Sequence, residues 1–401
     1  MSFDLAKVRA DFPILEEKIH GNRLVYLDSG ASAQKPNQVL DRMDWAHRHA
    51  YANVHRGLHT LANRATEAYE GGRFLNASRP EEIIFTRSAT EAINLVAASF
   101  LGPRIGEGDE IVLTIMEHHS NVVPWHFHRE RKGAVLKWVD VRDDGGFDLD
   151  AFEAALSPKT KMVAITHMSN VLGTVTPIKQ IVEIAHARGI PVLVDGSQGA
   201  VHLKVDVQDL GVDFYVFTGH KLYGPTGIGV LYGRYDLLAD MQPYQGGGEM
   251  IDTVTRDTVT YNEPPHRFEA GTPPIVQAIG LGAAIDYVEG IGREAAQAHE
   301  AELTGYALER LGRINSLRLI GTAPGKGGIF SFEVKGAHAH DVSTILDRYG
   351  IAVRAGTHCA MPLLQRFGVT STCRASFGLY TGKDDIDALV EGIEKARSFF
   401  A

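Results

Sequence analysis

Residues 192–225 read VLVDGSQGAVHLKVDVQDLGVDFYVFTGHKLYGP. Two apolar runs stand in this stretch, at 192–195 and 214–217, and polar residues and glycines follow each of them at once. Short apolar runs bounded in this way predict buried strands. Ligands of doubly wound sheets bind beyond the carboxyl ends of the strands, so Asp195 and Lys221 are candidate site residues.

The same rhythm extends over residues 82–231. Further apolar runs at 83–86, 111–114, 135–139 and 162–166 predict strands, and Thr166 ends one of them as Asp195 ends another. Stretches with helical spacing lie between, such as 91–100, with Ser88 or Thr90 as its cap, and 178–188, which begins after Pro177. This alternation predicts an α/β fold with a mostly parallel sheet and helices on both faces.

The pattern changes after residue 232. Residues 245–274 are rich in loop-forming residues: Gly246, Gly247, Gly248, Pro264, Pro265, Gly271, Pro273 and Pro274. Helical spacing returns at 275–310, strand-like runs follow at 328–334 and 352–354, and a closing helix is expected at 384–399. We therefore predict a large domain over 14–270 and a small α+β domain made of 271–401 with an N-terminal arm, 1–13.

Length and composition exclude several classes of protein. A chain of 401 residues with 44% hydrophobic and 22% charged residues suits two globular domains. The formal net charge of −9 argues against a nucleic-acid partner. No run reaches the roughly 20 apolar residues of a membrane span, and charges interrupt residues 1–13, so neither a membrane segment nor a secretory signal is expected. With only 2 cysteines, the chain is expected in the reducing cytoplasm.

Asp195 and Lys221 together predict a site for pyridoxal 5'-phosphate (PLP). A lysine alone is more often a surface residue, and an aspartate alone can be a helix cap or an ion-pair partner. A PLP site needs both an amine for the cofactor's aldehyde and a carboxylate that keeps the pyridine nitrogen protonated. The pair, with Asp195 at the end of one predicted strand and Lys221 after the next, therefore favours this chemistry.

Cys359 and Cys373 invite different interpretations. Cys359 lies in the loop RAGTHCAMP (354–362), where Arg354 and His358 favour the thiolate form that a nucleophile needs. Cys373 fits the default of a small buried apolar residue better. The adjacent His118 and His119 lack a third ligand at a recognised spacing, and we expect no metal site.

Seven motifs carry a resemblance that extends over nearly the whole chain. They are VRADFP (8–13), YLDSGA (26–31), ATEAINL (89–95), EHHSN (117–121), TGHKLYGP (218–225), GGGEMI (246–251) and FEAGTP (268–273). With them the sequence resembles the class V aminotransferase superfamily of fold-type I PLP enzymes, and within it the SUF-type cysteine desulfurases. The short loop around Cys359 resembles that branch rather than the longer-looped housekeeping branch.

The resemblance implies roles for individual residues. Lys221 would form the Schiff base with the cofactor and Asp195 would pair with the pyridinium nitrogen. Further cofactor contacts carry over to Gln198 at the phenolic oxygen, to His118 and Asn170 at the ring, and to Ala89, Thr90, Thr218 and His220 at the phosphate, with Thr272 reaching the phosphate from a second subunit. Arg374, with Asn170, would bind the substrate carboxylate.

The activity implied is the conversion of L-cysteine to L-alanine by a homodimer, with a persulfide left on Cys359. His118 is counted with Lys221 and Cys359 among the catalytic residues. A SufE-like or related protein would accept the sulfur for iron–sulfur cluster assembly. Selenocysteine lyase and cysteine-sulfinate lyase activities stay open as alternatives, because they share this site, and a non-catalytic scaffold is the alternative from another class.

Two departures from the family pattern stand out. The segment YEGGRFLNA (69–77) is shorter than usual, which puts the helix near residue 70 in doubt. Thr357 replaces a histidine that is common before His358, which alters the polarity of the loop at 354–362, called the sulfur loop below.

Overall fold

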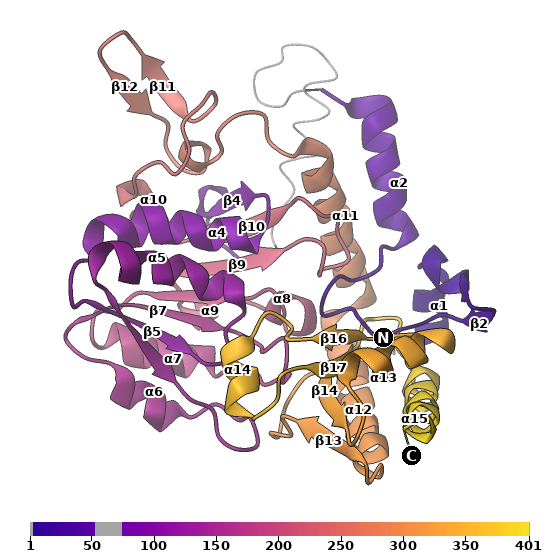
Figure 1. The fold of residues 1–401 in the computed structure, drawn as a ribbon. Coiled ribbons are helices and arrows are strands. Elements are labelled where there is room, and N and C mark those ends of the chain that lie inside the picture. Colours follow the sequence, from indigo (N-terminus) through magenta and orange to yellow (C-terminus); the bar gives the residue numbers. More distant parts are fainter. Residues whose placement is uncertain (1–2, 53–73, 401) are drawn as a thin grey trace.

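A seven-stranded sheet forms the centre of the molecule (Figure 1). The computed structural model describes residues 3–52 and 74–400, so most of the shortened segment at 69–77 lies outside the described residues. The strand order is β4-β10-β9-β8-β7-β5-β6, and β10 runs antiparallel to both of its neighbours while the other pairs are parallel. The strands are β4 (Ile83–Thr86), β5 (Glu110–Thr114), β6 (Val135–Val139), β7 (Thr160–Thr166), β8 (Val192–Asp195), β9 (Phe214–Thr218) and β10 (Gly229–Gly233). The predicted mostly parallel α/β sheet is confirmed.

Both faces of this sheet are covered, as the alternation along β8 illustrates. Val192 and Val194 belong to one buried cluster, and Leu193 between them belongs to the other, because successive side chains of a strand point to opposite faces. α7 (Ile178–His186) and α11 (Ile275–Ile291) pack on the first face, and α4 (Ala89–Leu95) with α5 (Val123–Lys132) packs on the second. The remaining helices of this part are α6 (Leu149–Ala155), α8 (Gly199–His202), α9 (Val207–Leu210) and α10 (Tyr235–Asp240).

A smaller antiparallel sheet stands beside the large one. Its order is β13 (Leu317–Ile320), β14 (Ile329–Val334), β17 (Thr372–Ser376), β16 (Arg354–Gly356). Phe330 and Phe332 of β14 are fully buried and pack in one cluster with side chains of α12 (Arg293–Gly312), α13 (Ala339–Arg348) and α15 (Lys383–Ser398). On the other side, Ser331 Oγ donates to Val171 O at 2.7 Å, which ties this sheet to the large one.

The N-terminal residues add to the small sheet's side of the molecule. After α1 (Leu5–Ala10), β1 (Lys18–Ile19) and β2 (Asn22–Arg23), strand β3 (Val25–Tyr26) pairs in parallel with β15 (Ile351–Ala352). Leu27 is fully buried in the same cluster as Phe330. α2 (Asn37–Trp45) then packs against α11. The domain boundaries at 13/14 and 270/271 stay a prediction.

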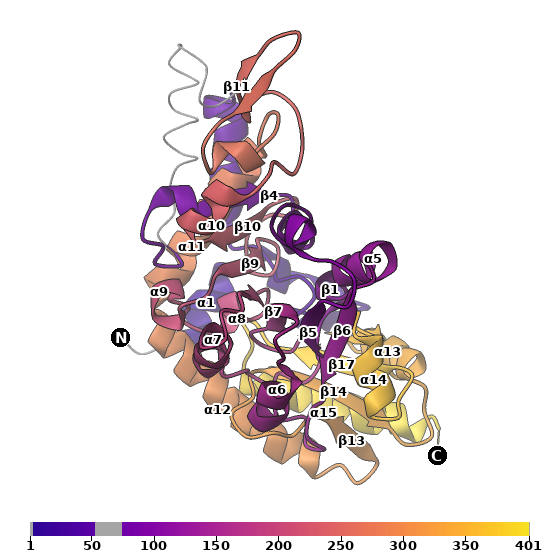
Figure 2. The same ribbon diagram turned by 90° about the vertical axis from the view of Figure 1, so that its left-hand side faces the viewer.

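Three segments differ from their predicted form. The helical region at 275–310 is two helices, α11 and α12, whose axes differ by 76° and which meet at Gly292 with φ of 90°. The loop-rich passage contains a hairpin, β11 (Ile251–Val254) with β12 (Val259–Tyr261), which projects from the body in both views (Figures 1 and 2). The run at 352–354 is broken at Val353 between β15 and β16, because each short strand pairs with a different neighbour. Within residues 3–52 and 74–400, no single helix is long and apolar enough to span a membrane, although α11 and α12 taken together have that length and composition.

Candidate active site

A cavity of about 290 Å³ opens at the carboxyl ends of β8 and β9. Its walls come from the large sheet, from the N-terminal segment at Gly30 and Ala31, and from the loop and strands around Cys359. Ten of the residues predicted from the sequence line it: Ala89, Thr90, His118, Asn170, Asp195, Thr218, His220, Lys221, Cys359 and Arg374. The structure therefore brings together groups that lie far apart in the sequence.

Lys221 stands on a tight turn directly after β9. Leu222 N and Gly224 N both donate to Gly219 O at 3.0 Å, and a Cβ at Gly219 would lie 2.6 Å from the side chain of Ile228, so only glycine fits there. Burial lowers the pKa of Lys221 to about 8, against the opposing attraction of Asp195. An amine with such a pKa is available as a nucleophile and a base near neutral pH.

Asp195 ends β8 and lines the cavity, where Oδ1 accepts a hydrogen bond of 3.0 Å from Ser197 N. Gln198 lies just behind the cavity wall, and its Nε2 donates to Gly30 O at 2.7 Å. Thr166, at the equivalent end of β7, is turned inward and donates to Met168 O at 3.0 Å. Of the two strand ends predicted, Asp195 is the one on the cavity.

His118 is held in one tautomer by its neighbour Ser120. The backbone N–H of Ser120 donates to His118 Nδ1 at 3.1 Å, so this ring nitrogen carries no proton and the neutral ring has its proton on Nε2. Ser120 Oγ lies 2.9 Å from the same nitrogen and 2.8 Å from Thr90 Oγ1. Burial lowers the pKa of His118 to about 4, which keeps the ring neutral. Sequence reasoning missed Ser120, although it lies inside the EHHSN motif.

Asn170 and Arg374 meet at the inner wall of the cavity. Arg374 Nη1 donates to Asn170 O at 3.0 Å, and Asn170 Nδ2 donates to His358 O at 2.8 Å. Asn170 therefore braces both the arginine and the sulfur loop, in addition to lining the cavity. Asn170, which the sequence predicts to bind cofactor and substrate, thus also holds Arg374 and the loop of His358 in place.

Cys359 is exposed and stands in a strained backbone. His358 and Cys359 have φ values of 50° and 55°, in the left-handed region that residues with a Cβ seldom adopt. Burial lowers the pKa of His358 to about 3, so this histidine is neutral and Arg354 is the charged basic neighbour along the loop. In contrast, Cys373 is buried, its Sγ lies 3.1 Å from Ala339 O, and burial raises its pKa to about 12.

Thr272 does not reach this cavity from its own subunit. It lines a separate cavity of about 210 Å³ together with Arg87, Glu91, Gln245 and others. The prediction that Thr272 completes the phosphate site of a second subunit is compatible with this place but stays a prediction.

Buried polar atoms around the cavity fit a bound PLP. Within the described residues, Gln198 Oε1, His358 Nδ1 and Arg374 Nε are buried without a hydrogen-bond partner. Such atoms are costly unless a ligand satisfies them. Lys221 and Asp195 supply the amine and the carboxylate that PLP requires, and Ala89 and Thr90 present the start of α4 to an anion. No cluster of three or more metal-binding side chains occurs in the part of the chain that the structure describes.

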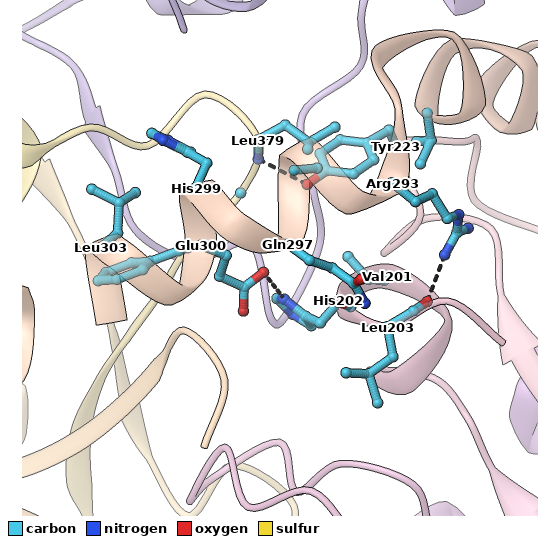
Figure 3. Close-up of a pocket in the computed structure, with 14 residues that line it drawn as sticks. Val201, His202, Leu203, Tyr223, Arg293, Gln297, His299, Glu300, Leu303 and Leu379 are labelled. Carbon is cyan, nitrogen blue, oxygen red and sulfur yellow. Dashed lines mark hydrogen bonds and ion pairs between the residues drawn. The ribbon is translucent and has the colours of Figure 1, made fainter. Parts of the chain in front are cut away.

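A second, smaller cavity of about 30 Å³ is lined by residues of α8 and α12 and by Tyr223 and Leu379 (Figure 3). In it His202 Nδ1 lies 2.8 Å from Glu300 Oε2, joining α8 to α12. Tyr223, two residues after Lys221, accepts a hydrogen bond of 2.9 Å from Leu379 N. The volume of this second cavity suits a water molecule rather than a substrate. We interpret it as the joint that holds the segments after Gln198 and Lys221 against the small sheet's helices.

Comparisons with known proteins agree with this geometry. The sequence model of the family Aminotransferase class-V matches residues 25–389. A probable cysteine desulfurase of Halalkalibacterium halodurans is 51% identical over 399 residues, which cover 98% of each chain. A cysteine desulfurase of Pectobacterium atrosepticum is 49% identical over 401 residues, again covering 98% of each chain. The crystal structure of the cysteine desulfurase CsdA from Escherichia coli superposes with a TM-score of 0.93 at 39% identity and covers 100% of both chains.

Proposed function

Because the chain belongs to the aminotransferase class-V family, we infer that it is a PLP-dependent cysteine desulfurase, and we propose Cys359 as the residue that takes the sulfur. One observation carries the proposal for Cys359. This exposed thiol lines the same cavity as Lys221 and the buried Arg374, whereas Cys373 is buried and faces Ala339. L-Cysteine bound there would have its thiol within reach of one protein thiol only.

The residues of the cavity divide the work of holding cofactor and substrate. Lys221 and Asp195 would hold PLP by its aldehyde and its pyridine nitrogen, with Gln198 and His118 beside the ring. The phosphate would lie against Ala89, Thr90, Thr218 and His220. Arg374 would bind the carboxylate of L-cysteine, since a guanidinium presents a fork of donors to two oxygens. Bound PLP supplies an electron sink for the carbanion at the substrate's α-carbon.

Proton and sulfur transfer follow from the side chains. Lys221 Nζ, with a pKa near 8, takes the proton from the α-carbon and returns one to the product. His118 is neutral with its one ring proton on Nε2, so it can donate a hydrogen bond in the cavity, but it does not transfer that proton, because its loss would leave an imidazolate anion. The Cys359 thiolate attacks the substrate sulfur, so an S–S bond forms as the Cβ–S bond breaks. The electron pair of the broken bond stays with the carbon skeleton, which leaves as L-alanine after protonation.

The decisive experiment measures both products. The holoenzyme is incubated with L-cysteine and a reductant, and alanine and sulfide are quantified together. Equal amounts of the two support the proposal. Alanine formed from cysteine sulfinate or selenocysteine, with little from L-cysteine, would instead favour one of the lyase activities.

We further propose that the enzyme is a homodimer. The projecting hairpin exposes Val254, Val259 and Tyr261 by 57%, 46% and 45%, and apolar side chains grouped in this way favour burial against a partner. Thr272 lies in a cavity beside the base of this passage. Light scattering tests the dimer, and Thr272→Ala should weaken PLP binding if the residue completes a partner's phosphate site. A fully active monomer would contradict both.

The sulfur acceptor and the location are proposals too. The exposed Cys359 and the neighbouring Met361, which is 57% exposed, can be reached by a SufE-like or related protein that carries sulfur to iron–sulfur cluster assembly. Transfer of radiolabelled sulfur from the loaded enzyme to such a protein tests this. The free thiols support a cytoplasmic location, which cell fractionation tests.

A further inference from the structure

His119 makes hydrogen bonds to the sulfur loop on both sides of Ala360, the residue that follows Cys359. Its backbone N–H donates to Cys359 O at 2.7 Å, and its ring nitrogen Nε2 accepts a hydrogen bond of 3.2 Å from Met361 N. His119 is not among the residues that line the cofactor cavity, in contrast to His118 and Ser120 beside it. Neither the cofactor nor the substrate therefore explains the histidine at this position.

The contact with Met361 requires one form of the His119 ring. A backbone N–H can only donate, so Nε2 must be the unprotonated nitrogen and the ring proton lies on Nδ1. Burial lowers the pKa of His119, which favours this neutral ring. His118 has the opposite tautomer, with Nδ1 as the acceptor. The two adjacent histidines are thus fixed in different forms by different neighbours.

The sulfur loop needs such contacts. His358 and Cys359 are both in the left-handed region, with φ of 50° and 55°, and this conformation persists only where the surroundings enforce it. On the N-terminal side, Asn170 Nδ2 holds His358 O at 2.8 Å, and His358 Nε2 lies 2.9 Å from Thr372 Oγ1. On the C-terminal side, Cys359 O and Met361 N are both bonded to His119.

We propose that His119 is a positioning residue that fixes the backbone of the Cys359 loop relative to the cofactor cavity. His118 faces the cavity and His119 faces the loop, and one peptide bond joins them. The thiol's place is thereby set by the same short turn, residues 118–121, that sets the ring beside the cofactor. This inference rests on the proposed role of Cys359.

The test compares three variants of the holoenzyme. His119→Leu removes the acceptor at similar volume, His119→Gln retains an acceptor at a similar reach, and His119→Asn retains one that is too short to reach Met361 N. His126→Leu on α5 serves as the control histidine. Hydrogen–deuterium exchange of residues 356–363, alkylation of Cys359 by iodoacetamide, persulfide formation from L-cysteine and PLP content are measured for each.

In His119→Leu and His119→Asn we expect exchange at Met361 N to rise about five- to tenfold, as loss of one hydrogen bond implies, and persulfide formation to fall by a similar factor. PLP content and the spectral change on adding L-cysteine should stay at the wild-type level. His119→Gln should restore both rates to within about twofold. If the leucine variant does not fold, the glutamine and asparagine pair still decides the question.

Wild-type rates of exchange at Met361 N and of persulfide formation in His119→Asn would overturn the proposal. So would a rate of persulfide formation that falls equally in His119→Gln and His119→Asn. Failure of the proposed function has a different signature. In that case the wild-type enzyme itself forms no persulfide on Cys359, whereas exchange at Met361 N still reports whether His119 holds the loop.

Discussion

Arg374 Nη2 lies 3.3 Å from the Oδ1 of Asp28, a long contact for a guanidinium that is only 2% exposed. The same carboxylate is bound more closely by Arg354, at 3.0 Å. Arg374 Nε has no partner among the described residues, and burial lowers the pKa of this arginine. A buried guanidinium with unused donors at a cavity is suited to a second carboxylate, namely that of the substrate.

Arg374→Lys should therefore raise the KM for L-cysteine about tenfold or more, because a lysine is a point charge and cannot present two parallel donors. Steady-state kinetics with alanine as the measured product checks this. Arg354→Lys is the matched control, since this arginine shares Asp28 but is half-exposed, and it should change KM less. An equal KM for wild type and Arg374→Lys would remove Arg374 from the substrate site.

Lys221→Ala should abolish turnover. In the wild type, reduction with borohydride should fix PLP covalently to the protein, and mass spectrometry should locate it on Lys221, whereas the variant should retain none. Lys204→Ala, on an exposed lysine, controls for the general effect of removing an amine. Measurable alanine production by Lys221→Ala would refute the assignment of this residue.

The two cysteines should respond in opposite ways to replacement by serine. Cys359→Ser should bind PLP and L-cysteine but form no protein persulfide, with little change in stability because the side chain is exposed. Cys373→Ser should still form a persulfide, yet lose about 1 kcal/mol of stability because a hydroxyl replaces a thiol in an apolar cluster. Alkylation after brief exposure to L-cysteine, followed by mass spectrometry, locates the extra sulfur. Its presence on Cys373 alone would reverse the two roles.

Acid should destabilise the protein through its buried histidines. Burial lowers the pKa of His167 from an ordinary 6.5 to about 4, so between these values the unfolded chain binds a proton that the folded chain does not. The free energy of unfolding therefore falls as the pH drops from about 6.5 toward 4, by about 2 kcal/mol at pH 5 for this residue. His220 and His358, with pKa values lowered by burial to about 4 and about 3, act in the same direction.

Urea unfolding at pH 7.5 and pH 5 measures this effect. His167→Asn places an amide atom where Nδ1 stands, so it can retain a hydrogen bond to Tyr215 OH, which lies 2.9 Å from His167 Nδ1, but it cannot titrate. This variant should lose less stability than the wild type between the two pH values. An unchanged difference would mean that His167 is not responsible.

The large sheet was predictable because its strands are short, apolar and buried on both faces. The predicted strands at 83–86, 135–139 and 192–195 coincide with β4, β6 and β8. The hairpin at Ile251–Val254 and Val259–Tyr261 was missed, because its strands are exposed and the Gly and Pro residues around them suggest loops. The bend at Gly292 was missed because helical spacing continues on both sides of this residue.

The cavity's residues were predictable as a set only through family motifs, since periodicity alone marks just the strand ends at Asp195 and Thr166 and the turn that holds Lys221. The hydrogen bonds and ion pairs between those residues were not predictable from the sequence. Ser120 sets the tautomer of His118, and Asp28 pairs with Arg374 over 346 positions of sequence. Such contacts depend on how separate segments meet in space, and no local pattern records that.

The pairing of β3 with β15 has a consequence for how the enzyme matures in the cell. Strand β3 at Val25–Tyr26 cannot pair until Ile351–Ala352 has been made, and the cavity is lined by both Gly30 and Arg374, which are 344 positions apart. During synthesis these pieces can meet only after the ribosome has released the chain beyond residue 374. We expect nascent chains to be unable to bind the cofactor until Arg374 has left the ribosome, and folding to be slow, as for proteins dominated by distant contacts.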